Sequence, residues 1–485
     1  MGRSSMSIVV LVPDGVGVRN FIFGRFLNLA LEMGEVHVLH AIPDQIFQVW
    51  QSYAPSGVNW HRLVPYSREG LLRFMLRNSA GYAQMYWAGT RAARHNADRP
   101  IKGSWRLRTA RRMARLVGRA AACRVGVRLL NHLHWRAAFG HEAVQKYVEL
   151  FQSLKPRVLF CSHQRPASVL PVVLAARKLG IPTATFIFSW DNLTSKGSII
   201  APFDHFLVWS NLMREELLRY YPEVPPERVH VIGTPQFDPY ADESLIWSRE
   251  EFFKRVGGDP SRPIICYSGG DTGTCPEDPA HVRVLMELIR SRRIRGNPQV
   301  VLRPCPVDEG SRYDAVRRDY PELIYAPPAW VHDGASEWSQ VTPLPEDVRL
   351  LANLTWHCDL NINMASTMTL DFAIHDKPVV NIAFDVADPP PFGVPLWDYF
   401  YKFDHYQPVI ELGAARFARS PDELAEHVNA YLENPSLDRE ARRKLVELEV
   451  GVPIGSSSER IVQVLAGIVG AGKCTSASSV ANTQG

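Results

Sequence analysis

This sequence of 485 residues lacks a long apolar segment that could span a membrane, and it lacks a cysteine pattern typical of a disulfide framework. No apolar run approaches the roughly 20 residues that cross a bilayer, and the apolar run at positions 8–12 is too short for a signal peptide. The seven cysteines are scattered, without the CxxC spacing of a zinc or redox motif. We therefore expect a cytoplasmic protein of a reducing compartment, free in solution or peripheral at a membrane.

Acidic residues are missing between Asp98 and Glu142, although the net charge of the whole chain is only +4. A helix would gather several arginines of this interval on one face, because those at 108, 111, 112, 115 and 119 recur three and four residues apart. Two interpretations stay open: a solvated or ion-paired face, or a dock for an anionic membrane surface or a lipid-diphosphate acceptor. The absence of a nucleic-acid fold motif argues against a nucleic-acid partner. The basic residues of the interval are Arg99, Lys102, Arg106, Arg108, Arg111, Arg112, Arg115, Arg119, Arg124, Arg128 and Arg136.

Strand and helix patterns alternate along most of the chain, which predicts an α/β fold with parallel, doubly wound sheets. The alternation restarts near Arg262, so we expect two Rossmann-like domains facing each other across a cleft. The expected boundaries are an N-terminal domain at 1–240 with a basic helical insertion at about 69–140, a linker at 241–262, a C-terminal domain with its closing helices at 263–470, and a disordered tail at 471–485.

Three loops of the second domain follow predicted strands and carry groups suited to binding a diphosphate. After "IICY", Ser268 precedes Gly269 and Gly270, and glycines let a backbone approach a ligand closely. Arg303 ends "VVLR", where its guanidinium can make a bidentate contact with phosphate oxygens. Each loop also has a plain structural interpretation, as a turn or a surface arginine. Together they predict a nucleotide-diphosphate pocket.

The third loop follows the strand "LNINM". Ser366 and Thr367 stand where a helix is expected to begin, so hydroxyls, N–H groups and the helix dipole can together bind an anion. Ser366 is equally well placed to act only as a helix N-cap. Asp371 lies one turn further along the same helix.

The segment "NMASTMTLDFAIHDKPVVNIAFD" at 363–385 resembles the donor domain of GT-B glycosyltransferases, with their Ser-Ser/Thr-hydrophobe, Asp and Asp-Lys-Pro pattern. It is similar to the CDP-glycerol glycerophosphotransferases and the bacterial surface-polysaccharide glycosyltransferases. The motifs "SWDNLTSKG", "DHFLVWS" and "VHVIGTPQFD" also resemble that group. The resemblance covers roughly 183–238 and 264–385, and the basic insertion lies outside it.

This resemblance implies that the C-terminal domain binds the donor and the N-terminal domain binds the acceptor. The chain departs from the polyol-phosphate transferases at two places. Their Trp-His-Gly-Thr is replaced by residues 190–193, "WDNL", and their His-Pro by Cys305-Pro306. Losing both histidines favours a sugar-transferring relative. The implied donor-binding residues are Ser268, Gly269, Gly270, Arg303, Ser366, Thr367 and Asp371.

Three residues at strand ends of the first domain are candidates for the general base. Asp191 follows the strand "TATFIFSW", and Asp14 lies in the first loop, "PDGVGVRNF". His163 ends the strand "RVLFCS", and the usual pKa of histidine, near neutrality, suits the role. Each has a structural alternative, as a loop carboxylate or a packed histidine. The candidates for acceptor binding are Trp190, which can stack on a sugar ring, Asn192 and Arg19.

The sequence therefore predicts a glycosyltransferase that moves a sugar from a nucleotide-diphosphate donor to a glycan or lipid-linked acceptor. No Asp-x-Asp occurs in the chain, so we expect a metal-independent reaction without a cofactor. Three alternatives stay open: a UDP-sugar 2-epimerase-like enzyme, a polyol-phosphate transferase, and a non-enzymatic basic scaffold.

Overall fold

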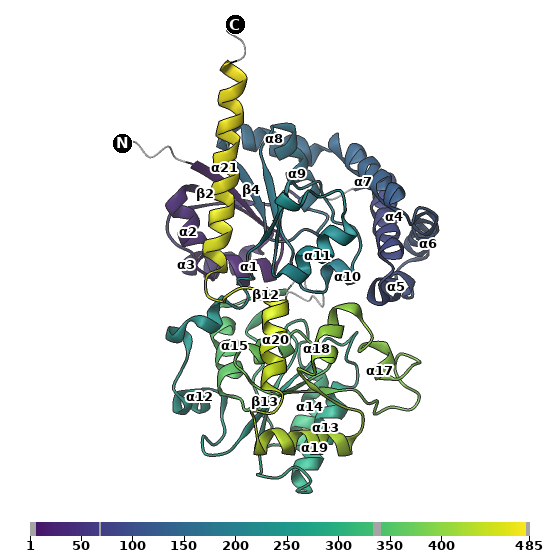
Figure 1. The fold of residues 1–485 in the computed structure, drawn as a ribbon, viewed down its shortest axis with the longest axis vertical. Coiled ribbons are helices and arrows are strands. Elements are labelled where there is room, and N and C mark those ends of the chain that lie inside the picture. The colour runs from purple at the N-terminus through teal and green to yellow at the C-terminus, as the bar shows by residue number, and fades with distance from the viewer. Residues whose placement is uncertain (1–5, 67–68, 333–340, 482–485) are drawn as a thin grey trace. The chain divides into compact units, whose positions relative to one another are not determined.

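The chain forms two compact units in the computed structural model, which describes residues 6–66, 69–332 and 341–481 (Figure 1). The first unit comprises Met1–Pro235 and Ser456–Gly485, and the second comprises Gln236–Gly455. Each unit is built on one parallel sheet with helices packed against it, as the alternating strand and helix patterns predict.

The first sheet has seven strands in the order β3-β2-β1-β4-β5-β6-β7, and every pairing is parallel. The order reverses direction between β1 and β4, so the sheet is doubly wound. Its central strands are buried apolar runs, as expected of a parallel sheet covered on both faces. The strands are β1 (Met6–Val12), β2 (Gly34–His40), β3 (Val58–Arg62), β4 (Val158–Cys161), β5 (Thr183–Phe186), β6 (His205–Val208) and β7 (Val229–Val231).

The first helix, α1, starts at Gly15, because the side chain of Asp14 accepts a hydrogen bond from Gly17 N at 3.0 Å and caps it. The helices of the first unit outside the insertion are α1 (Gly15–Phe21), α2 (Phe26–Met33), α3 (Asp44–Tyr53), α8 (Glu142–Leu154), α9 (Val169–Lys178), α10 (Asn192–Ser195), α11 (Asn211–Tyr220) and α21 (Ser457–Ala481).

The basic insertion is helical, as predicted. It stands beside the sheet of the first unit, on the right in Figure 1. A small apolar core of its own forms between α4 and α7, with Ala80, Ala83, Val127 and Leu130 at its centre. Its helices are α4 (Gly70–Ala88), α5 (Arg91–Asp98), α6 (Trp105–Ala120) and α7 (Arg124–Phe139). No helix among the described residues is both long and apolar enough to span a bilayer.

The C-terminal helix α21 belongs to the first unit, whereas the sequence predicts that the closing helices belong to the second domain. Glu459 pairs with Arg25 at 2.8 Å, and Arg460 donates to the carbonyl oxygen of Ile232 at 2.8 Å. Ile461 and Leu465 are buried. The helix continues to Ala481, into the segment expected to be a disordered tail. Residues 241–262, expected to be a linker, are part of the second unit, which begins at Gln236.

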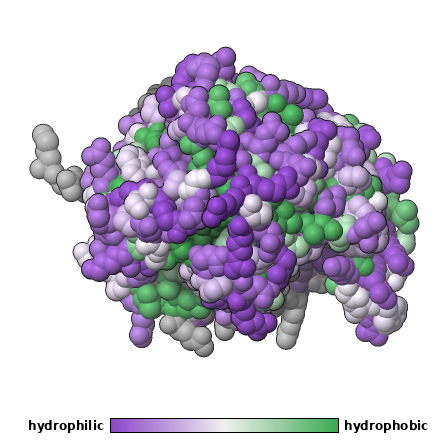
Figure 2. Space-filling view, turned by 90° about the horizontal axis from the view of Figure 1, so that it is seen from below, coloured by the Kyte–Doolittle hydropathy of each residue, from purple (hydrophilic) through white to green (hydrophobic). Residues whose placement is uncertain are grey.

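The second unit contains a six-stranded parallel sheet in the order β10-β9-β8-β13-β14-β15, with a reversal between β8 and β13. A separate antiparallel pair joins β11 (Trp330–His332) to β12 (Val341–Pro343). On the face shown in Figure 2 most of the surface is hydrophilic, and apolar residues form separate patches. The sheet strands are β8 (Ile264–Ser268), β9 (Gln299–Arg303), β10 (Ile324–Tyr325), β13 (Leu360–Asn363), β14 (Val379–Ile382) and β15 (Arg416–Ala418).

The helices of the second unit cover both faces of this sheet. They are α12 (Arg249–Val256), α13 (Asp278–Arg290), α14 (Asp314–Asp319), α15 (Pro345–His357), α16 (Met368–Ile374), α17 (Leu396–Tyr399), α18 (Gln407–Leu412), α19 (Pro421–Glu433) and α20 (Arg439–Glu449).

Candidate active site

The first sheet brings Asp14 and His163 together where its strand order reverses. Asp14 follows β1 and His163 follows β4, and these strands are hydrogen-bonded neighbours. Ligands of open α/β sheets bind beyond the carboxyl ends of the strands at such a reversal. His163 Nδ1 there contacts Asp14 Oδ2 in an ion-pair geometry. The sequence presents the two residues as rival bases, whereas the structure makes them a pair.

The surroundings of Asp14 keep its carboxylate ionised. Burial alone would raise its pKa, but the imidazole of His163 and the N–H groups of Gly17 and Val16 outweigh that effect and lower the pKa below its usual value. One oxygen accepts from Gly17 N and the other faces His163. Asp14 is therefore suited to orient the imidazole and to stabilise its protonated form.

The second ring nitrogen of His163, Nε2, is buried and has no hydrogen-bond partner among the described residues. Phe188 stacks on the imidazole, with ring centroids 4.0 Å apart and an interplanar angle of 14°. Because an ionised carboxylate only accepts hydrogen bonds, the proton of a neutral imidazole lies on Nδ1 and the lone pair on Nε2. The pair thus presents an oriented nitrogen that can accept a proton from a hydroxyl group.

Two further unpartnered polar atoms belong to residues beside this pair. Ser162 precedes His163, and its buried Oγ would lie 2.6 Å from a Cβ on Gly17, so the glycine lets α1 approach the end of β4. Asn20 Nδ2 is also buried without a partner, while Asn20 Oδ1 accepts from Arg19 Nε at 3.2 Å. Sequence reasoning selected Arg19 but missed Ser162 and Asn20. Their closeness to His163 and Gly17 in the chain was the available signal.

Asp191, the third predicted base, is engaged by its own loop. Its carboxylate accepts hydrogen bonds from Ser195 Oγ at 2.7 Å and from Asn192 Nδ2 at 3.1 Å. Lys196 Nζ lies 3.4 Å from the same group. Two hydrogen-bond donors and a cation from the same loop therefore surround this carboxylate. The geometry therefore gives Asp191 a structural role in the turn around α10, and its role as base stays a prediction.

Trp190 and Asn192 are more buried than the predicted acceptor contacts require. Their exposed fractions are 5% and 6%, so the indole offers little ring face to a sugar. Asn192 Oδ1 accepts from Gln164 Nε2 at 3.1 Å, and its amide nitrogen is used by Asp191. The strand end after β5 is thus closed by internal hydrogen bonds, which the sequence pattern alone did not show.

The glycine loop after β8 is packed against protein atoms. A Cβ on Gly269 would lie 2.4 Å from Tyr313 Oη, and a Cβ on Gly270 would lie 2.2 Å from Cys275 Sγ. The close approach that glycine permits here is therefore to Tyr313 and Cys275. A donor-binding role for Gly269 and Gly270 stays a prediction.

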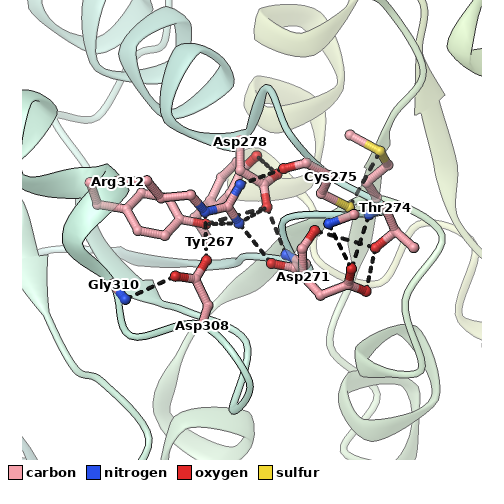
Figure 3. A network of polar contacts seen from close by, with 12 residues as sticks. Tyr267, Asp271, Thr274, Cys275, Asp278, Asp308, Gly310 and Arg312 are labelled. Carbon is pink, nitrogen blue, oxygen red and sulfur yellow. Dashed lines mark hydrogen bonds and ion pairs between the residues drawn. The ribbon is translucent and has the colours of Figure 1, made fainter. Parts of the chain in front are cut away.

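A network of polar contacts holds this loop in place (Figure 3). Asp278 Oδ2 accepts from Gly270 N at 2.6 Å, and Asp278 Oδ1 accepts from Tyr267 Oη at 2.7 Å. Arg312 donates to the carbonyl oxygens of Gly270 at 2.7 Å and Cys275 at 2.5 Å. Burial raises the pKa of Asp278, although Arg312 and Tyr267 act against that shift. The loop is consequently rigid and internally satisfied.

Arg303 ends β9 as predicted, but it is buried and paired. Its Nη2 donates to both carboxylate oxygens of Asp347, at 2.9 and 3.0 Å. Asp347 also accepts from Trp330 Nε1 at 2.7 Å and from Ala329 N at 3.0 Å. Arg303 Nη1 is buried without a partner among the described residues, so this single nitrogen is the atom left for a phosphate oxygen. Arg303 is therefore already paired with Asp347, and its contact with a diphosphate stays a prediction.

The loop after β13 keeps one of its two hydroxyl groups unused. Ser366 N donates to Asn363 Oδ1 at 3.1 Å, and Ser366 Oγ accepts from Met368 N at 3.2 Å, so Ser366 does serve as a local cap. The hydroxyl of Thr367 forms no hydrogen bond within the described chain. The helix that follows, α16, is short and starts at Met368. Ala365 adopts a left-handed φ of 44°, a strained conformation that is common near binding sites.

The last two predicted donor-binding residues have internal partners. Ser268 is buried, and its Oγ accepts from Asn361 Nδ2 at 2.8 Å. Asp371 is also buried and accepts a hydrogen bond from Tyr240 Oη. An internal hydroxyl donor explains why a buried carboxylate is tolerated at this position on α16.

Comparison with solved structures identifies the fold. A putative UDP-N-acetylglucosamine 2-epimerase from Listeria monocytogenes superposes with a TM-score of 0.50 at 13% identity, covering 95% of both chains. The chain has the GT-B fold. A glycosyltransferase from Rickettsia africae ESF-5 gives a TM-score of 0.49 at 11% identity, covering 96% of this chain and 99% of that one. The wall teichoic acid polymerase TagF gives 0.49 at 11% identity, covering 96% and 90%. No protein-family model and no curated protein sequence matches the chain.

The GT-B fold assigns one Rossmann-like sheet to each unit, which confirms the predicted fold class. Within the described ranges 6–66, 69–332 and 341–481, no group of three histidine, cysteine, aspartate or glutamate side chains is arranged to hold a metal ion. A metal-independent reaction stays a prediction.

Proposed function

We propose that this protein is a glycosyltransferase in which His163 is the general base and Asp14 positions it. The observation that carries the proposal is the Asp14–His163 pair at the reversal of the first sheet, with Nε2 buried and unpartnered. A buried nitrogen without a partner costs free energy unless a ligand group completes it. A sugar hydroxyl is such a group.

The chemistry that the pair supports is the activation of an acceptor hydroxyl. His163 Nε2 takes the proton as the hydroxyl oxygen forms a bond with the anomeric carbon of the donor sugar. The bond between that carbon and the diphosphate oxygen breaks, and the nucleoside diphosphate leaves with the electron pair. Asp14 stays ionised throughout, because its pKa is lowered, and stabilises the imidazolium.

The donor diphosphate is proposed to bind to the second unit, at the reversal between β8 and β13. Thr367 supplies an unused hydroxyl, Ser366 lies beside it, and Arg303 Nη1 is an unpartnered cationic donor at the neighbouring strand end. Ser268, Gly269 and Gly270 stand at the end of β8, which lies between β9 and β13, and Asp278 binds the N–H group of Gly270. These groups can bind phosphate oxygens and stabilise the leaving diphosphate.

Transfer to an acceptor is preferred over isomerisation because the first unit carries a large exposed helical insertion, α4–α7. A free sugar nucleotide needs no such surface, whereas a glycan or lipid-linked acceptor can use one. The solved epimerase of the same fold keeps isomerisation as the second candidate.

The first test is a thermal-shift screen with a panel of nucleotide sugars. A ligand at 100 times its Kd should stabilise the protein by about 2.7 kcal/mol, and the matching nucleoside monophosphate should stabilise it far less. Thr367→Val should weaken the response to the diphosphate. If the monophosphate and the diphosphate donor stabilise the protein equally, the diphosphate assignment is wrong.

The second test separates the candidate activities with the radiolabelled donor that binds. A glycosyltransferase transfers label to a glycan or lipid extract, an epimerase converts the sugar nucleotide without an acceptor, and a scaffold does neither. Acceptor-independent isomerisation as the only activity would contradict the proposal.

A further inference from the structure

Large apolar side chains are exposed mainly on the helical insertion. Sixteen large apolar side chains are exposed in the described chain; ten lie between positions 71 and 139, and six lie elsewhere. Trp105, Leu116 and Val125 have exposed fractions of 66%, 62% and 74%. Contiguous exposed apolar groups on a folded protein mark an interaction surface.

These residues are not needed by the core of the insertion. That core is formed by Ala80, Ala83, Val127 and Leu130 on the inner faces of α4 and α7. Gly118 of α6 faces α4 so closely that a Cβ there would lie 2.5 Å from Tyr82 Cβ. Gly118 and Ala114 form the buried side of α6, whereas Trp105, Met113, Leu116 and Val117 are exposed.

The outer face of α6 carries an apolar row beside a basic row. Trp105, Met113 and Leu116 are exposed at eight- and three-residue spacing, and Arg108 and Arg112 are exposed at four-residue spacing. Positions three and four apart share a helix face, and Leu116 lies four residues after Arg112, so the two rows run side by side. The result is an amphipathic helix whose outer surface is both apolar and cationic.

The outer face of α7 repeats this composition. Val125, Leu129 and Leu133 recur every four residues and are all exposed. Arg128 and Arg136 alternate with them, one position before Leu129 and three after Leu133. Both helices pack on α4 and belong to the same insertion (Figure 1).

The arginines of these faces are not neutralised by carboxylates. Across the described ranges, no salt bridge joins an arginine at positions 106–136 to an acidic side chain. Arg106 and Arg119 instead lie over the rings of Trp105 and Tyr86, at 5.4 and 5.8 Å from the ring centroids. The interpretation as a face paired with acidic residues is therefore excluded for the described chain.

We propose that the outer faces of α6 and α7 bind the surface of a lipid bilayer that contains anionic lipid. An arginine row beside a Trp, Met and Leu row matches the boundary between headgroups and acyl chains, where amphipathic helices lie. A nucleic acid offers phosphates for the arginines but no apolar layer for Leu116, Val125 or Leu129. The inference does not depend on the proposed function, since vesicle binding is measured without donor or acceptor.

The charge test is co-sedimentation of the full chain with phosphatidylcholine vesicles, with and without phosphatidylglycerol, at low and high salt. We expect binding that needs the anionic lipid and falls with salt. Arg108→Glu/Arg112→Glu/Arg119→Glu should weaken binding by about 100-fold or more, since each basic residue near such a surface contributes roughly fivefold, or about 1 kcal/mol. The matched control, Lys178→Glu/Lys254→Glu/Arg318→Glu, changes net charge equally and should bind like wild type.

The apolar test uses Trp105→Ser/Leu116→Ser, which should remove the binding that persists at high salt. Trp356→Ser/Leu448→Ser changes the same residue types on exposed positions of the second unit and should leave binding unchanged. A circular-dichroism melt of each variant verifies that it is folded.

Three results would overturn the inference. The first is no vesicle binding under any condition. The second is vesicle binding that does not depend on lipid charge or salt. The third is an equal loss of vesicle binding in the test and control variants. Binding to a short single-stranded RNA without binding to vesicles would assign the surface to nucleic acid instead.

Discussion

The reversals of strand order in the two sheets hold polar groups in different states. In the first unit, Asp14 and His163 are paired, and the imidazole keeps Nε2 unused. In the second unit, the loop at Gly269 and Gly270 is closed by Asp278, Arg312 and their neighbours, which satisfy one another. Both places are where an open α/β sheet binds ligands.

The difference indicates a division of roles. A site that moves protons needs a group with an unused lone pair, and the buried Nε2 of His163 supplies one. A site that holds a phosphate needs rigid donors, and a satisfied network provides rigidity without itself reacting. In the proposed function, the reversal of the first sheet supplies the reacting group and that of the second sheet holds the donor.

The largest expected effect comes from removing the base. His163→Asn should lower turnover by about 10²–10⁴-fold while leaving donor affinity unchanged, because a general base contributes that much to the transition state alone. Asp191→Asn is the matched comparison, since Asp191 is a strand-end residue whose carboxylate is already engaged. Steady-state kinetics with calorimetric donor binding measures both.

The reverse order of the two effects on turnover would contradict the assignment of His163 as the base. If Asp191→Asn abolished turnover and His163→Asn did not, the base would belong to the loop after β5, and the unused Nε2 would have only a structural explanation.

The rigidity of the second reversal can be tested by adding one methyl group. Gly270→Ala places a Cβ 2.2 Å from Cys275 Sγ, so it should lower the free energy of unfolding by about 1–3 kcal/mol. Gly467→Ala on α21 has open space around it and should be neutral or slightly stabilising. Urea unfolding curves compare the two, and equal stability would mean that the loop yields easily.

The Asp14–His163 pair should also contribute to stability in a pH-dependent way. Asp14→Asn should lower the free energy of unfolding at neutral pH by about 1.5 kcal/mol, because it removes hydrogen bonds to a charged group. Since folding lowers the pKa of Asp14 from its usual 3.8, this stabilisation is complete above the unfolded pKa and disappears as the pH falls through the folded one. Unfolding curves of wild type and variant should therefore converge below about pH 4.

Replacing Asp278 should change the free energy of unfolding least, and its effect should depend on pH in the opposite direction to that of Asp14. Burial raises its pKa, so the folded chain holds the proton more tightly than the unfolded chain does. Wild-type stability then declines as the pH rises from the unfolded pKa through the folded one. Relative to wild type, Asp278→Asn should become more favourable as the pH rises above about 4. If the free energies of unfolding of the Asp14 and Asp278 variants changed in parallel with pH, relative to wild type, the pKa values of the two carboxylates would not shift in opposite directions.

The order of elements could be predicted well because it depends on local patterns. Short buried runs such as "SIVVLV" and "VLFC" form strands, as expected in a parallel sheet that is covered on both faces. The same holds for the helices of the insertion.

The candidate site could be predicted only in part. Asp14, His163 and Ser366 were found because they directly follow strands. The pairing of Asp14 with His163 joins residues far apart in the chain, and the sequence contains no signal for it. The same is true of the pairing of Arg303 with Asp347 and of Asp371 with Tyr240, while the donor-binding roles of Arg303 and Asp371 stay predictions.

The sequence by itself determined the two parallel sheets, the strand ends that carry polar residues and the arginine-rich helices, because each follows from residue type and spacing over a few turns or strands. Tertiary structure decided which of those polar groups stay unused. That choice depends on which side chains meet after folding: Nε2 of His163 finds no partner, whereas the carboxylate of Asp191 finds several. The packing of α6 on α4 also leaves Trp105 and Leu116 exposed. Glycine at position 118 permits that packing, because a Cβ there would collide with Tyr82.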